Sequence, residues 1–314
     1  MKRFIMLSIL LGIMMIMTPL ISVRYERVEG ESVQSQTSTD NNVIKVMSSD
    51  NGFIKSVDTR EYLIGSVAGE MPASYHTEAL KAQAVACYTY AKYISSRDAE
   101  KLGGADISDD SSVYQSYINE SERKEKWGDD FDKNEKIISD AVDAVLFSYL
   151  SYDNEPAMTV YHNICSGVTE SAENVWGEKV SYLVSVVSAG DKLSPDYQSK
   201  TKIALNEFKN ILKKNDIEFD DLGKIERFDS GYVKTVKIGE KSISGTAFRE
   251  MFSLKSADFD VETGEENVVF TCRGNGHFVG MSQYGADYMA RQGASFQEIL
   301  SHYYPGTELK ILKN

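Results

Sequence analysis

The sequence places a carboxylate, Glu70, at the predicted end of a helix. Residues 59–69 have the pattern of a helix, in which Leu63, Val67 and Glu70 lie on one face. Pro72 ends this helix, because proline disfavours helical geometry at the residue before it. A carboxyl group on that face would lose solvent, and we expect this placement to suit it to donate a proton. The alternative interpretation is a solvated glutamate at a frayed helix end.

Two further segments hold side chains that could bind a ligand or react with one. Residues 161–170 follow a predicted strand and place a histidine, a cysteine, a serine and a glutamate within nine positions. Residues 273–285 contain four glycines together with His277, Ser282 and Gln283. Glycines at this density suit a loop whose backbone turns tightly and approaches a ligand closely. Residues 302–306 add a histidine at an apolar helix end with a sharp stop.

The histidines and cysteines allow two other chemistries. A zinc site could be formed by His162, Cys165, Cys272 and His277, but their spacings are not those of a zinc finger. Cys165 and His277 could form a nucleophilic pair. Against this, an exported thiol is open to oxidation, and the sequence shows nothing that lowers its pKa. The glycine-rich run is not a dinucleotide fingerprint either, because it lacks the βαβ frame.

The elements that must position these residues give a mixed pattern of helices and strands. Residues 78–95 form an alanine-rich helix, capped by Thr77, which we expect to pack at the centre of the fold. Residues 98–135 are polar and acidic, and we expect a long loop with short helices there. The other predicted elements are helices at 135–149, 203–214, 244–252, 287–293 and 295–304, and strands at 157–162, 182–188, 232–238 and 266–272. Strict alternation of strands and helices is absent, which predicts the α+β class.

The N-terminus differs from the rest of the chain. Residues 4–23 carry no charge and follow Lys2 and Arg3, and twenty residues of helix are long enough to span a bilayer. The flanking positive charges predict a cytoplasmic N-terminus and an extracytoplasmic remainder. A cleaved signal peptide is the alternative, although the large residues before Arg24 form a poor cleavage site. The predicted organisation is a membrane anchor at 1–23, a flexible polar stalk at 24–52 and a folded domain at 53–314.

Composition limits the classes of ligand. The 314 residues include 34 Lys and Arg against 47 Asp and Glu, which gives a net charge of −13, and the part after residue 23 carries −15. Non-specific binding of nucleic acid needs a basic patch, so this class of function is excluded. Three widely separated cysteines are too few for a disulfide framework in a chain of this length. The length allows a sizeable hydrophobic core.

Three blocks of the sequence resemble the stage II sporulation protein D family (SpoIID/LytB). The first block, residues 61–91, reads EYLIGSVAGEMPASYHTEALKAQAVACYTYA. The second, residues 162–177, reads HNICSGVTESAENVWG, and the third, residues 274–309, reads GNGHFVGMSQYGADYMARQGASFQEILSHYYPGTEL. The blocks occur in the family's order and extend over most of the folded domain. The predicted anchor and stalk resemble the sporulation branch of the family rather than its amidase-enhancer branch.

The resemblance implies a peptidoglycan lytic transglycosylase. This lyase cleaves the β-1,4 bond between N-acetylmuramic acid (MurNAc) and N-acetylglucosamine (GlcNAc) and leaves a 1,6-anhydro end. The glutamate of the family's E-M-P motif matches Glu70, which would act as general acid and then as general base. The other two blocks would line a glycan-binding cleft with His162, Ser166, Gly167, Thr169, Glu170, His277, Ser282, Gln283 and Tyr284.

The resemblance also implies a cellular setting, and we expect no cofactor. The family acts in forespore engulfment beside a peptidoglycan amidase/endopeptidase and a membrane scaffold protein, on strands stripped of stem peptides. Some clostridial relatives bind a metal in the loop that matches residues 103–114; this loop has no histidine or cysteine here, so we expect no zinc. The sequence departs from the family pattern at Tyr88, Cys165 and Phe278. The alternative functions are a non-catalytic activator of a cell-wall amidase and a hydrolase that uses Cys165.

Overall fold

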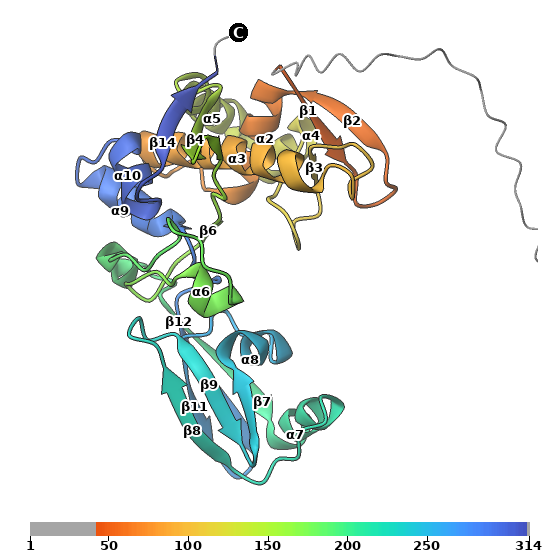
Figure 1. Cartoon of the computed structure of the whole chain (residues 1–314), viewed down its shortest axis with the longest axis vertical. Helices are drawn as coiled ribbons and strands as arrows, with labels where there is room; N and C mark the ends of the chain where they lie inside the picture. Colours follow the sequence, from red (N-terminus) through yellow and green to blue (C-terminus); the bar gives the residue numbers. More distant parts are fainter. Residues whose placement is uncertain (1–41, 313–314) are drawn as a thin grey trace, which may run out of the picture. The chain divides into compact units, whose positions relative to one another are not determined.

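The computed structural model describes residues 42–312 (Figure 1). The predicted membrane anchor at 1–23 and the predicted stalk as far as residue 41 lie outside these residues. Within 42–312, no helix has the length and apolar character needed to cross a membrane. The described part is a mixed α+β structure, which confirms the predicted class.

Strand β1 (Val43–Met47) begins inside the segment predicted as stalk. It pairs antiparallel with β2 (Ile54–Asp58) and parallel with β3 (Ile107–Ser108). Ile44 and Val46 are buried, because side chains two positions apart lie on the same face of a strand. The prediction of a flexible stalk that continues to residue 52 is therefore wrong for this strand.

Helices α2 (Thr59–Glu70) and α3 (Thr77–Asp98) form the centre of a first hydrophobic core. Both confirm predicted helices. Asp58 caps α2 by accepting a hydrogen bond from the backbone N–H of Glu61. The predicted cap of α3 is wrong: Thr77 is the first helical residue, and His76 Nδ1 accepts from the N–H of Glu78 at 3.3 Å.

The other elements around the first core come from two separate parts of the chain, residues 120–193 and 281–311. They are α4 (Glu120–Trp127), the 3₁₀ helix η1 (Gly128–Asp130), α5 (Phe131–Asp143), β4 (Ser148–Tyr152), β5 (Glu155–Pro156), β6 (Tyr161–His162), α6 (Ala172–Trp176), the 3₁₀ helix η2 (Ala189–Leu193), β13 (Met281–Ser282), α9 (Gln283–Arg291), α10 (Phe296–Tyr303) and β14 (Glu308–Ile311). The strands form the sheets β14-β4-β5 and β13-β6. Helices α9 and α10 confirm the two predicted closing helices, and α9 starts four residues earlier than predicted.

Three predicted elements of this part differ in the structure. The helix predicted at 135–149 ends at Asp143, and its last residues enter β4, which pairs with β14. The strand predicted at 157–162 is reduced to β6, which pairs with β13. Residues 182–188 form no strand; they meet residues 167–172 through the isolated bridge between Val168 and Val187 and through single backbone hydrogen bonds. Each outcome depends on whether a distant segment offers a partner for the backbone, which local sequence does not specify.

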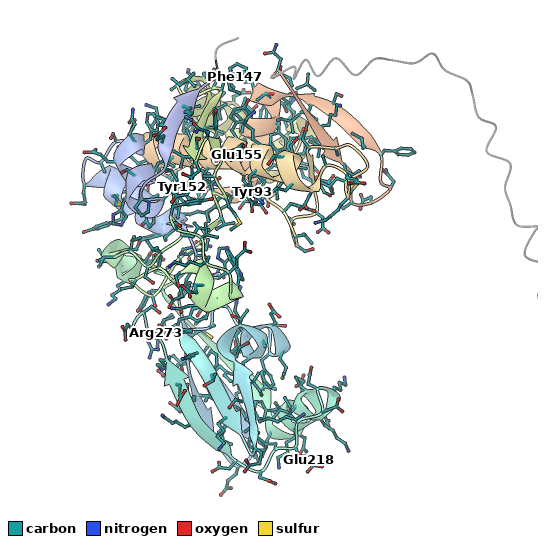
Figure 2. The ribbon with its side chains drawn as sticks, in the orientation of Figure 1. Tyr93, Phe147, Tyr152, Glu155, Glu218 and Arg273 are labelled. Carbon is teal, nitrogen blue, oxygen red and sulfur yellow. The ribbon has the colours of Figure 1, made fainter. Side chains whose placement is uncertain are left out.

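A second hydrophobic core lies between residues 203 and 272. Its elements are β7 (Gln198–Ala204), α7 (Leu205–Lys214), β8 (Leu222–Arg227), β9 (Val233–Ile238), β10 (Lys241–Ser244), α8 (Gly245–Met251), β11 (Phe259–Thr263) and β12 (Asn267–Arg273). They form the sheets β10-β9-β8 and β11-β12-β7. Phe208, Phe248 and Phe270 are buried against one another at its centre. Arg273, labelled in Figure 2, ends β12 and forms an ion pair with the buried Asp258 at 2.9 Å.

Candidate active site

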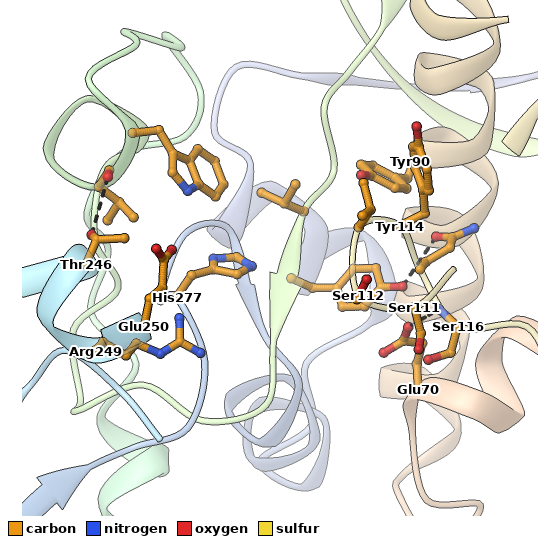
Figure 3. Close-up of a pocket in the computed structure, with 16 residues that line it drawn as sticks. Glu70, Tyr90, Ser111, Ser112, Tyr114, Ser116, Thr246, Arg249, Glu250 and His277 are labelled. Carbon is orange, nitrogen blue, oxygen red and sulfur yellow. Dashed lines mark hydrogen bonds between the residues drawn. The ribbon is translucent and has the colours of Figure 1, made fainter. Parts of the chain in front are cut away.

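A cavity of about 540 Å³ is lined by Glu70 on one side and by His277 on the other (Figure 3). The wall around Glu70 includes residues 111–116, in the loop before α4. The wall around His277 includes Trp176 at the end of α6 and Thr246, Arg249 and Glu250 from α8. The cavity thus joins segments of the first core to a helix of the second.

Glu70 is the last residue of α2 and is partly buried. Its Oε1 accepts a hydrogen bond from the backbone N–H of Ser116 at 2.6 Å. The predicted position at a helix end is confirmed, and the side chain lines the cavity (Figure 3). The bond from Ser116 holds one carboxylate oxygen and leaves Oε2 available to carry a proton.

Two glycines of α2 allow the loop that carries Ser116 to lie directly on the helix backbone. A Cβ atom at Gly65 would lie 2.5 Å from the carbonyl oxygen of Ile118. A Cβ atom at Gly69 would lie 2.8 Å from the Cβ of Ser116. Because these glycines are four residues apart, they occupy one face of the helix. The close approach of the loop to this face places the N–H of Ser116 within hydrogen-bonding distance of the Glu70 carboxylate.

The buried side-chain amide of Gln115 also holds this loop in place. Gln115 Nε2 donates to the phenolic oxygen of Tyr62 at 2.6 Å and to the carbonyl of Cys87 at 3.0 Å. Tyr161, which lines the cavity, donates from its hydroxyl to Gln115 Oε1 at 3.3 Å. Burial, with the charges of Cys87 and Glu70, raises the pKa of Tyr161 well above its usual value. Tyr161 is therefore a neutral phenol whose hydroxyl proton is used within the protein, in the hydrogen bond to Gln115.

Arg123 holds the far end of the loop. Its guanidinium is buried, donates to the carbonyl of Ile118 at 3.0 Å, and pairs with Glu61 and Glu135. The roles of Ser116, Gln115 and Arg123 could not be predicted from the polar composition of residues 98–135. Local sequence gave no signal for Arg123, because its partners Glu61 and Glu135 lie 62 and 12 residues away along the chain.

The wall opposite Glu70 is aromatic and cationic. Trp176 is 44% exposed, and its ring centroid lies 5.3 Å from that of His277. His277 Nδ1 accepts from the N–H of Val279 at 3.0 Å. Burial, and then the positive charge of Arg249, lowers the pKa of His277 from 6.5 to about 4. His277 is therefore neutral at physiological pH.

The lowered pKa of His277 predicts a specific dependence of stability on pH. Between about pH 4 and 6.5 the unfolded chain binds a proton at His277 and the folded chain does not, so this residue makes stability fall as the pH falls from 6.5 toward 4. In urea unfolding at pH 4.5 and 7.5, His277→Gln should lose less stability on acidification than the wild-type chain. Equal losses in the two proteins would contradict the assigned cause.

The other eight predicted binding residues do not line the cavity. They are His162, Ser166, Gly167, Thr169, Glu170, Ser282, Gln283 and Tyr284. His162 lies next to His277, with ring centroids 5.7 Å apart, and burial holds its pKa well below the usual value. Glu170 is buried and accepts hydrogen bonds from Asn174, Ser185 and Ser230, among others.

The remaining six predicted binding residues make their contacts within the protein. Ser282 caps α9 and donates to Asp191 at 2.7 Å, and Gln283 lies against Gln83. Ser166, Thr169 and Tyr284 contact backbone or side chains nearby, and a Cβ at Gly167 would meet Lys192. Their contact with a substrate stays a prediction.

Cys165 is buried and bonded to a carboxylate. Its thiol donates to Asp191 Oδ2 at 2.8 Å. Burial, with the charge of Asp191, raises its pKa well above the usual value, so the thiol stays protonated. A nucleophilic cysteine needs the thiolate, and Cys165 is not among the residues that line the cavity. The geometry therefore argues against Cys165 as a nucleophile.

Replacing Cys165 by serine should leave glycan cleavage unchanged, because a serine hydroxyl can still donate to Asp191. Cys165→Ala is the matched variant. It removes the donor from a buried carboxylate, which should destabilise the chain by about 1–3 kcal/mol. Cleavage assays and urea unfolding of both variants test these expectations. Loss of activity in a folded Cys165→Ser would restore the cysteine mechanism.

The cysteines and histidines do not form a metal site in the described part of the chain. Between residues 42 and 312, no group of three or more His, Cys, Asp or Glu side chains is placed to hold a metal ion. All three cysteines are free and buried, and Cys272 lies in the second core. Cys87, on α3, lies in the first core.

Comparison with known proteins gives a consistent family assignment. A family model described as "Stage II sporulation protein" matches residues 48–152. Stage II sporulation protein D of Bacillus subtilis is 33% identical over an alignment of 329 residues, gaps included, which covers 98% of this chain and 96% of that protein. Its counterpart in Bacillus amyloliquefaciens is 36% identical over 268 residues, 85% of this chain and 78% of that protein. The amidase enhancer of B. subtilis is 27% identical and is covered over 40% of its length.

Proposed function

The chain belongs to the stage II sporulation protein D family, and on this premise we propose that it is a lytic transglycosylase acting on peptidoglycan during sporulation. The observation that supports this most directly is the placement of Glu70. Its carboxylate faces a cavity, one oxygen is fixed by Ser116, and the other is free (Figure 3). A general acid requires this combination of access and orientation.

The reaction uses one carboxyl group twice. Glu70 first gives its proton to the glycosidic oxygen, so that the bond from MurNAc C1 to this oxygen breaks and GlcNAc leaves with a free 4-hydroxyl. Positive charge then develops at C1, as in other glycosidic cleavages. The Glu70 carboxylate next removes the proton of the MurNAc 6-hydroxyl, whose oxygen bonds to C1. The product is a 1,6-anhydro ring, and Glu70 is protonated again.

The opposite wall suits a sugar strand. The half-exposed ring of Trp176 offers an apolar face for the C–H groups of a sugar. Thr246 on this wall, and Ser111 and Ser112 on the wall around Glu70, offer hydroxyl groups for hydrogen bonds to the hydroxyl and N-acetyl groups of the sugars. We assign Trp176 the role of stacking platform for a sugar ring.

A second carboxylate in the cavity favours one other candidate, a hydrolase. Glu250 lines the wall opposite Glu70, and glycoside hydrolases use two carboxyl groups that flank the scissile bond. Hydrolysis would leave a reducing MurNAc end, which is heavier than the anhydro end by one water. Glu250→Gln would abolish hydrolysis but would leave transglycosylation, which needs only Glu70.

Mass spectrometry of the products tests the proposal. Purified glycan strands digested by the full chain should yield anhydro-MurNAc ends. Reducing ends would favour the hydrolase. Intact strands together with a faster amidase reaction would favour the non-catalytic activator instead.

Because the residues before 42 include an apolar stretch, we further propose that the chain is anchored in the cell membrane and works outside it beside the amidase/endopeptidase and scaffold of the engulfment machinery.

A further inference from the structure

Arg249 presents an unpaired positive charge to the cavity. Helix α8 places Thr246, Arg249 and Glu250 at helical spacing, and all three line the cavity. The guanidinium of Arg249 uses Nε to bond the carbonyl of Leu254 at 3.3 Å. Among the ion pairs of residues 42–312, none involves Arg249. Its two terminal nitrogens are therefore free to bind a ligand.

The neighbourhood of Arg249 does not neutralise this charge. Glu250 is the next residue and lines the same wall, yet it is exposed and forms no ion pair with Arg249. Figure 3 shows the guanidinium below the ring of His277, and its charge contributes to the lowered pKa of that ring. A half-buried arginine beside a neutral aromatic wall is a site for an anion, and its planar fork matches a carboxylate.

The glycan that the proposed function assigns to this cavity offers one carboxylate of its own. Hydroxyl and N-acetyl groups are neutral, whereas the 3-O-lactyl group of MurNAc ends in a carboxyl group. When a stem peptide is attached, this carboxyl group becomes an amide and loses its charge. Resting on the proposed function, we propose that Arg249 binds the lactyl carboxylate of the MurNAc unit in the cavity.

Binding measured without cleavage tests the role of Arg249. The full chain in detergent carries Glu70→Gln, and calorimetry compares three GlcNAc–MurNAc oligosaccharides: one with free lactyl groups, one with lactyl carboxamides and one with stem peptides. A bond to a charged partner should make the first ligand bind about tenfold more tightly than the second. Adding Arg249→Gln should make these two ligands bind alike.

Two further variants and a fourth ligand act as controls. Arg249→Lys keeps the charge without the fork and should retain part of the preference. Arg97→Gln, at an exposed position of α3, should retain all of it. A chitooligosaccharide, which has no lactyl group, should bind the Arg249→Gln chain as it binds its parent. This last result shows that the cavity is intact in the variant.

Three results would overturn the assignment. In the first, the preference for the lactyl carboxylate over the carboxamide survives in Arg249→Gln. In the second, Arg249→Gln lowers the affinity equally for the charged and the amidated ligand. In the third, stem-peptide ligands bind as tightly as peptide-free ones, and Arg249→Gln weakens their binding. The last would mean that Arg249 binds a peptide carboxylate. Digestion by the wild-type chain is measured separately, so a missing anhydro product refutes the proposed function, while the binding comparison still decides the role of Arg249.

Discussion

Replacing Glu70 by glutamine is expected to lower the rate of glycan cleavage by roughly a hundredfold to ten-thousandfold, the contribution of a positioned general acid and base. Glutamine has the shape of glutamate and its amide oxygen can still accept from the Ser116 N–H, so the loop should stay in place. The amide cannot give a proton to the leaving oxygen or remove one from the 6-hydroxyl. Both steps of the proposed reaction should therefore slow.

The measurement is the release of anhydro-MurNAc ends from purified strands by wild type and Glu70→Gln at equal concentration. Glu125→Gln, an exposed glutamate on α4, is the matched control and should cleave as the wild type does. Unfolding in urea should give similar midpoints for all three proteins. Full activity of Glu70→Gln would remove this residue from the mechanism.

Replacing Gly65 by alanine is expected to destabilise the chain by about 1–3 kcal/mol, the usual cost of overpacking a buried contact. Alanine in a helix interior normally adds about 1 kcal/mol relative to glycine, so the expected sign is the reverse of the helix propensity. The reason is the Cβ, which would lie 2.5 Å from the carbonyl oxygen of Ile118 and 2.7 Å from the ring of Tyr117. The loop must move, and Ser116 would then lose its bond to Glu70.

Urea unfolding and cleavage assays should both respond to Gly65→Ala. We expect a lower unfolding midpoint and a lower rate of cleavage. Gly69→Ala should act in the same direction through Ser116, whose Cβ would lie 2.8 Å away. Glu125→Ala, at an exposed helical position, supplies the propensity control and should change neither property. A Gly65→Ala chain more stable than wild type would show that the loop does not need this close approach.

Much of the fold around Glu70 could be predicted from local patterns. The apolar spacing in α2, the stop at Pro72 and the small residues of α3 each act through neighbours in sequence, so they are visible without a structure. In contrast, β4 and residues 182–188 were predicted wrongly. A segment rich in tyrosine or valine becomes a strand only where another strand lies beside it. Strand β14 pairs with β4 in this way, whereas residues 182–188 have only an isolated bridge.

Motifs and helical periodicity are local, so the sequence was enough to identify the carboxylate, its place at a helix end and the resemblance to a family. The surroundings of the carboxylate could not be predicted, because they depend on distant segments of the fold. Ser116 bonds to Glu70 from 46 residues away, and the cavity's other wall comes from α6 and α8, far along the chain. Contacts of this range depend on how two cores pack around a cavity. The geometry therefore selected Arg249 and Trp176 as cavity residues, where local sequence had pointed to Glu170 and Ser282.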